Sequence, residues 1–84
     1  MRIYMQGPIT DDSSPRYYQL FLQEDLLGGW NVVREWGFQG ASGRTVREYF
    51  ECREDAIVAL AKSRDAQLKR GYRVMFMQGE AQPK

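Results

Sequence analysis

Arginine and aromatic side chains are the residues able to do chemistry in this chain, because the catalytic and metal-ligating types are nearly absent. None of the 84 residues is histidine, and Cys52 is the single cysteine. These counts exclude a Ser-His or Cys-His nucleophile pair, a zinc site and a disulfide framework. Asp11 and Asp12 are adjacent carboxylates without further ligands, so we interpret them as solvated loop residues. The sequence predicts no catalytic residue, no metal site and no cofactor.

Recognition of an anionic partner is the chemistry that remains. The chain has nine arginines and three lysines, and guanidinium groups suit bidentate contact with phosphate. The net charge is only +1, so any basic surface has to be local. Residues 1–29 carry a charge of −2, residues 30–50 carry +1 and residues 51–84 carry +2. A basic surface is therefore expected in the second half of the chain, with solvated surface arginines as the alternative.

Two aromatic residues, Trp36 and Phe38, are candidate contact residues. Trp36 either packs against the core or lies open at a strand end, where its ring could stack on a base or ribose for about 1–3 kcal/mol. Phe38 lies in the glycine-rich residues 37–43. There it either plugs the end of the core or is exposed as a stacking surface or an anchor for a protein partner. Trp30 is expected in the core.

Alternating side chains predict a set of β-strands. In the second of them, Tyr18, Leu20 and Leu22 form the more apolar face. A Gly-Gly pair at 28–29 predicts a hairpin, and the glycines of 37–43 indicate a sharp turn or a close approach. The polar residues 10–15 predict a loop. The expected strands are residues 2–5, which fit an edge strand, 16–24, 30–36, 44–50 and 72–77.

At residue 52 the period changes to about 3.6, which predicts an amphipathic helix of roughly four turns. Its expected apolar stripe is Ile57, Leu60, Ala61 and Leu68. Cys52 stands at the expected N-cap and Gly71 at the expected C-cap.

This order of elements predicts an α+β fold. We expect an antiparallel meander sheet of four or five strands with the helix packed on it. Residues 1–84 are expected to form one domain, with a core over 15–77 and a polar tail over 78–84. A single thiol, no signal-like start and no apolar stretch of about 20 residues predict a cytoplasmic protein.

The segment WNVVREWGFQGASG, Trp30 to Gly43, resembles the signature of the WGR domain family, in which a strand runs into Trp-Gly-Arg and a glycine-spaced turn. The resemblance covers about residues 15–77 and implies a compact antiparallel sheet with one helix. In poly(ADP-ribose) polymerases this module helps to bind DNA strand breaks and is not itself catalytic, and in bacteria it also occurs alone. Four further landmarks agree in order: Arg16-Tyr17-Tyr18-Gln19, the hairpin at 26–30, the helix start at 50–56 and the exit Arg70-Gly71-Tyr72.

The resemblance also assigns roles to particular positions. Trp36 is the family tryptophan, which in the polymerases packs against the sugar end of a broken strand. Phe38 takes the place of the family arginine, Pro15 that of an asparagine, and Gln67 that of a lysine in bacterial members. Three polar contact positions are thus replaced, and Phe offers none of the donors of Arg. The candidate nucleic-acid-binding residues are Arg16, Trp36, Arg44, Arg47, Lys69 and Arg70.

Two functions follow from these residues. The first is weak binding of DNA ends or nicks, with Trp36 stacking and the basic side chains meeting phosphates. The alternative is a protein-interaction module that uses the turn at Gly37, Phe38, Gln39 and Gly40 and has lost the DNA role. Arg44 and Arg47, three apart on one strand, are expected on opposite faces of the sheet. We expect no membrane partner and no small-molecule substrate, and the oligomeric state does not follow from the sequence.

Overall fold

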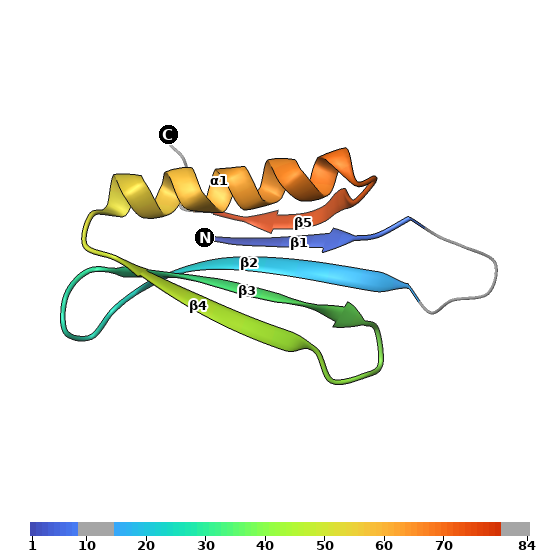
Figure 1. Cartoon of the computed structure of the whole chain (residues 1–84), viewed down its shortest axis with the longest axis horizontal. Coiled ribbons are helices and arrows are strands. Elements are labelled where there is room, and N and C mark those ends of the chain that lie inside the picture. Colours follow the sequence, from blue (N-terminus) through green and yellow to red (C-terminus); the bar gives the residue numbers. More distant parts are fainter. Residues whose placement is uncertain (9–14, 80–84) are drawn as a thin grey trace.

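The computed structural model describes residues 1–8 and 15–79. Five strands form one antiparallel sheet, and one helix packs on it (Figure 1). This architecture confirms the predicted α+β fold. Asp11 and Asp12, and the tail from residue 80 onward, lie outside the described residues. The elements are β1 (Arg2–Gln6), β2 (Arg16–Glu24), β3 (Trp30–Phe38), β4 (Arg44–Phe50), α1 (Arg53–Lys69) and β5 (Arg73–Gln78).

The order of the strands departs from the sequence prediction at β1. Strands β2, β3 and β4 form the expected meander, but β1 lies inside the sheet between β2 and β5. Ile3 stands opposite Leu20, Met5 stands opposite Tyr18, and both β1 side chains are fully buried. The edge position is taken by β5 instead.

The hairpin between β2 and β3 forms where the Gly-Gly pair predicted it. Gly28 and Gly29 have φ values of 99° and 88°, a backbone conformation that glycine adopts at little cost. Asp25 closes the loop, because its Oδ1 accepts a hydrogen bond from the Leu27 N–H and its Oδ2 accepts one from the Asn31 amide, each at 2.9 Å. These bonds, the backbone one first, lower the pKa of Asp25.

Glycines also shape the connection between β3 and β4. Gly40 has a φ of 85°, as a tight turn requires. A Cβ on Gly37 would lie 3.0 Å from the Gly43 Cα, and a Cβ on Gly43 would lie 2.7 Å from the Trp36 carbonyl oxygen. The two predicted explanations, a sharp turn and a close approach, therefore both hold, and the approaching group is the chain itself.

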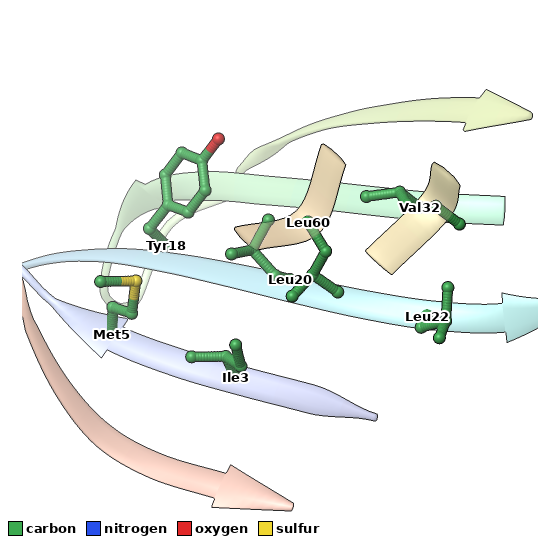
Figure 2. Close-up of a cluster of buried hydrophobic side chains, with 8 residues drawn as sticks. Ile3, Met5, Tyr18, Leu20, Leu22, Val32 and Leu60 are labelled. Carbon is green, nitrogen blue, oxygen red and sulfur yellow. The ribbon is translucent and has the colours of Figure 1, made fainter. Parts of the chain in front are cut away.

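The core lies between the sheet and α1 (Figure 2). The predicted apolar face of β2 is buried, and Ala56 and Leu60 reach it from the helix. Trp30, expected in the core, is half-buried at its margin, where the Arg53 guanidinium carbon lies 5.5 Å from the ring centroid. The sheet side chains of the core are Ile3, Met5, Tyr18, Leu20, Leu22 and Val32.

The N-cap of the helix is Cys52 as predicted, whereas its C-cap is Arg70, and the predicted Gly71 follows one position later. Cys52 is the N-cap with extended backbone, but its thiol donates a 2.9 Å hydrogen bond to Glu54 Oε1 rather than capping a backbone N–H. This bond lowers the pKa of Glu54. At the other end Gly71 has a φ of 95°, and the N–H groups of Gly71 and Tyr72 donate to the carbonyls of Leu68 and Gln67 at 3.0 Å. This is a Schellman motif.

The predicted apolar stripe of the helix was partly wrong. The structure buries Ala56, Leu60 and Gln67, whereas Leu68 is exposed. Seven residues complete almost two full turns, so Gln67 continues the face of Leu60, while Leu68 is rotated by about 100° from Gln67. The small Ala56 lets this face approach the sheet closely, and that contact determines the rotation of the helix.

Candidate functional site

A cavity of about 500 Å³ lies where β2 begins and where β3 and α1 end. Three arginines are among the residues that line it: Arg16 on β2, Arg34 on β3 and Arg70 at the end of α1. No carboxylate is among the described residues that line it. We call this cavity the arginine pocket. Its composition suits an anion, because three cationic donors meet without a neutralising acid.

Aromatic rings form the floor of the arginine pocket. Tyr18 and Trp36 are cross-strand partners, and their rings stack with centroids 5.8 Å apart and an interplanar angle of 16°. Tyr72 meets Tyr18 edge-on at 6.2 Å. Because Tyr18 is part of the core, one face of the Trp36 ring packs against a core side chain. Its half-buried ring therefore combines the two predicted roles: it packs against the core and also lines an open cavity.

Arg34 is the functional candidate that the sequence reasoning did not identify. It lies on β3 between Val32 and Trp36, on the face that α1 covers. Its Nε is buried, and no hydrogen-bond acceptor for it exists among the described residues. A buried donor without a partner is costly, and an anion in the pocket would satisfy it. The detectable signal was a cation inside the apolar face of a strand, where charge is rarely placed.

Arg16 and Phe38 form a pair at the mouth of the pocket. They are cross-strand partners, and the Arg16 guanidinium carbon lies 5.2 Å from the Phe38 ring centroid. Phe38 is 44% exposed, so it does not plug the core. A ring face attracts a cation. Phe38 stands where the resemblance expects an arginine, and its ring holds the guanidinium of Arg16 close to that position.

Arg70 reaches the pocket because of how α1 ends. It is the C-cap of the helix, directly before Gly71, where the negative end of the helix dipole favours a cation. Gln67, one turn earlier, is buried and also lines the pocket. The end of the helix thus places Arg70 at the pocket, while the rotation of α1 brings Gln67 there.

The other predicted basic residues do not line the pocket. Arg44 stands opposite Trp36 on the same face of the sheet, whereas Arg47 stands opposite Val33 on the other face. The prediction that these two arginines lie on opposite faces is therefore confirmed. Lys69 is exposed in the last turn of α1.

The turn after β3 contributes to both faces of the sheet. Gly37 and Phe38 line the arginine pocket, while Gln39 and Gly40 border a cavity of about 380 Å³ on the open face, next to Tyr4 and Tyr17. The Gln39 side-chain amide donates a 2.9 Å hydrogen bond to the Tyr4 hydroxyl oxygen. The predicted interaction turn is thus divided between two surfaces.

Glu35 is the acidic residue nearest in sequence to Trp36, and it faces away from the pocket. The Tyr17 hydroxyl donates to its Oε2 and the Gln19 amide donates to its Oε1, each at 3.2 Å. Burial and the bond to Glu35 raise the pKa of Tyr17. These bonds engage the Glu35 carboxylate on the open face, so it does not neutralise the three guanidinium groups.

Two further site types are absent from residues 1–8 and 15–79. No cluster of three or more cysteine, aspartate or glutamate side chains there could hold a metal ion. No helix in these ranges has the length and apolar character needed to cross a membrane.

Comparisons with known proteins bear on the whole chain. The family model of the WGR domain matches residues 1–78. The chain is similar to an uncharacterized protein, y4dW, of Sinorhizobium fredii (strain NBRC 101917 / NGR234), with 29% identity over 72 residues. That match covers 86% of this chain and 35% of the relative, so the chain spans about a third of the relative's length. No solved structure gave a significant match.

Proposed function

The chain belongs to the WGR domain family, and on that premise we propose that it is a non-catalytic module that binds DNA ends or nicks through the arginine pocket. The observation that carries the proposal is the convergence of Arg16, Arg34 and Arg70 with Trp36 around one cavity. Guanidinium groups would hold phosphates, and the Trp36 ring would stack on a sugar or base.

The shape of the pocket supports ends and nicks over continuous duplex. A ring at the floor of a cavity can stack only on a sugar or base whose face is open. Inside a continuous duplex each base pair is covered by its neighbours, whereas a break leaves one face free. Phosphates flanking the break would meet Arg16 and Arg70 at the rim, and Arg34 would donate its free Nε–H deeper in the pocket.

The loss of the family arginine at Phe38 is compatible with this proposal. Arg16 lies across the Phe38 ring, and Arg34 lies two residues before Trp36 on the same face of β3. Arg16 and Arg34 would therefore supply guanidinium groups near Trp36, although Phe38, at the position of the family arginine, supplies none.

Fluorescence anisotropy with nicked, blunt and single-stranded DNA at low salt tests the proposal. We expect binding to nicked or blunt DNA and clear weakening by Trp36→Ala, with Trp36→Phe retaining part of the affinity through its ring. Absence of binding to all three DNAs, or equal binding by Trp36→Ala, would contradict the proposal.

Arg70→Ala and Arg47→Ala form a matched pair for the same assay. Both remove one charge from an exposed side chain, but only Arg70 lines the pocket. Arg70→Ala should weaken binding and lower the slope of log affinity against log salt by about one, while Arg47→Ala should change little. Equal losses from both variants would place the DNA elsewhere.

A second candidate function is protein interaction through Phe38. The observation that favours it is the 44% exposure of this ring in the turn, since exposed aromatic side chains are common anchors at interfaces. Failure of DNA binding would leave this candidate as the better one.

A further inference from the structure

The two edges of the sheet differ in how they are protected. Strand β4 carries the charged residues Arg44, Arg47 and Glu48, as edges that avoid pairing usually do. Strand β5 at the other edge pairs with β1 alone among the described strands (Figure 1). It carries four consecutive large apolar side chains, residues 74–77, which are 38% to 56% exposed. An unprotected apolar edge of this kind favours strand addition.

We propose that β5 pairs with the β5 of a second copy of this chain, antiparallel and about a two-fold axis perpendicular to the sheet. The two five-stranded sheets would then join into one continuous sheet. The proposal concerns a surface distinct from the arginine pocket and does not depend on nucleic-acid binding.

The register with β1 assigns each β5 side chain to a face of the sheet. Val74 stands opposite Met5 and Met77 opposite Ile3, so both lie on the face that bears α1. Phe76 stands opposite Tyr4, on the open face. A register shift between Tyr4 and Met5 makes room for one extra residue on β5. Because of this bulge, residues 74 and 77 share a face, although three positions separate them.

This face pattern suits pairing of β5 with itself. Opposite residues in an antiparallel pair lie on the same face, and a perpendicular two-fold axis keeps the α1 face of both copies on one side. Setting Val74 opposite Met77 of the second copy satisfies this condition. The same register sets Arg73 opposite Gln78, both on the open face, since they stand opposite Gln6 and Arg2 of β1.

The charges in this register also favour a second copy as the occupant. Its central pairs are apolar, and Arg73 meets a neutral Gln78, so no like charges stand opposite each other. The whole chain has a net charge of only +1, and such a charge opposes self-association weakly. Helix α1 packs mainly over β2 and β3, and Val74 and Met77 remain exposed on its side of the sheet.

Sedimentation equilibrium of the 84-residue chain, from micromolar to millimolar concentration and without nucleic acid, tests the proposal. We expect twice the mass of one chain at the upper concentrations. Phe76→Lys should weaken the association at least about tenfold, because a lysine at the edge opposes pairing. Phe76 is half-exposed, so this change spares the core. Circular dichroism would check that the variant is folded.

Two lysine variants serve as controls. Val46→Lys lies on the β4 edge and Leu27→Lys at the hairpin tip, and both residues are exposed and apolar. Both variants should associate as the unchanged chain does. A single-chain mass at all concentrations, a dimer that survives Phe76→Lys, or a dimer lost in Val46→Lys would overturn the proposal.

Disulfide trapping tests the register. In a Cys52→Ser background, a mixture of Val74→Cys and Met77→Cys chains should form the mixed disulfide under mild oxidation, because opposite residues lie within bonding range. Val74→Cys alone should cross-link much less, because its two copies would be about 10 Å apart along the strands. Equal cross-linking of the mixture and of Val74→Cys alone would overturn this register.

Discussion

At the scale of single residues, Arg34 carries the most information. A guanidinium Nε buried without an acceptor among the described residues costs about 1–3 kcal/mol, and native proteins rarely retain such groups without a reason. Its neighbours Trp36 and Phe38 are more conventional, since one rests on Tyr18 and the other carries Arg16. Arg34 is therefore the side chain on which the proposed anion site depends most directly.

Arg34→Met separates binding from stability. Methionine retains an apolar stem of similar reach and removes the unpartnered donor, so the free energy of unfolding should stay equal or rise by up to about 1 kcal/mol. DNA affinity should fall, because one guanidinium leaves the pocket. Urea denaturation and fluorescence anisotropy measure the two quantities. A large loss of stability with unchanged affinity would make Arg34 a structural residue instead.

At the scale of elements, short turn and capping motifs determine where the strands and the helix end. The Schellman motif after Lys69 directs Arg70 and Tyr72 to the pocket, and the Gly37 and Gly43 pair lets β3 and β4 approach closely. Asp25 performs the corresponding task in the first hairpin through its bonds to Leu27 and Asn31.

The hairpin should respond to acid through Asp25. Its folded pKa is lowered, so its stabilising contribution is complete above the unfolded pKa of about 3.9 and is lost as pH falls through the folded value. Protonation of Asp25 should therefore shift the Leu27 amide resonance at a pH below about 3.9. A pH titration followed by heteronuclear NMR measures this shift. Asp25→Asn should abolish the shift, and a midpoint at or above 3.9 in the unchanged chain would refute the assignment.

At the scale of the whole molecule, the net charge is small and the basic surface is local. The net charge of +1 cannot draw the protein onto nucleic acid by a long-range field, but three guanidinium groups meet in one pocket. A perpendicular two-fold axis through paired β5 strands would set the pockets of both copies on the same side of the joined sheet. Dimerisation, if the sedimentation experiment shows it, would then present two binding sites to one surface.

Salt dependence follows from the small number of cations in the pocket. Contact with three or four phosphates predicts an affinity that falls about 10- to 100-fold between 50 and 200 mM salt. Anisotropy titrations across that range measure the slope. A much steeper slope would require basic residues outside the pocket, such as Arg44 and Lys69, and a flat one would argue against phosphate contact.

The sequence alone determined the local features of this protein. Alternation along residues 16–24 and 30–36 predicted two strands and the buried face of the first. The glycines at 28–29 and 37–43 predicted the turns. These features depend on the dihedral preferences and side-chain periodicity of neighbouring residues, which are legible along the chain. The absence of histidine from the 84 residues is likewise read from the sequence alone.

Only the tertiary structure decided which strands lie at the edges and which side chains meet. The alternation of residues 2–6 is the same for an edge as for an interior strand, so the place of β1 depended on pairing with β2 and β5. Gln67 was buried in place of Leu68 because contact through Ala56 and Leu60 set the rotation of α1. Arg34 and Arg70 are far apart along the chain, and they meet because β3 and the end of α1 converge. Such long-range contacts leave no periodic trace in the sequence.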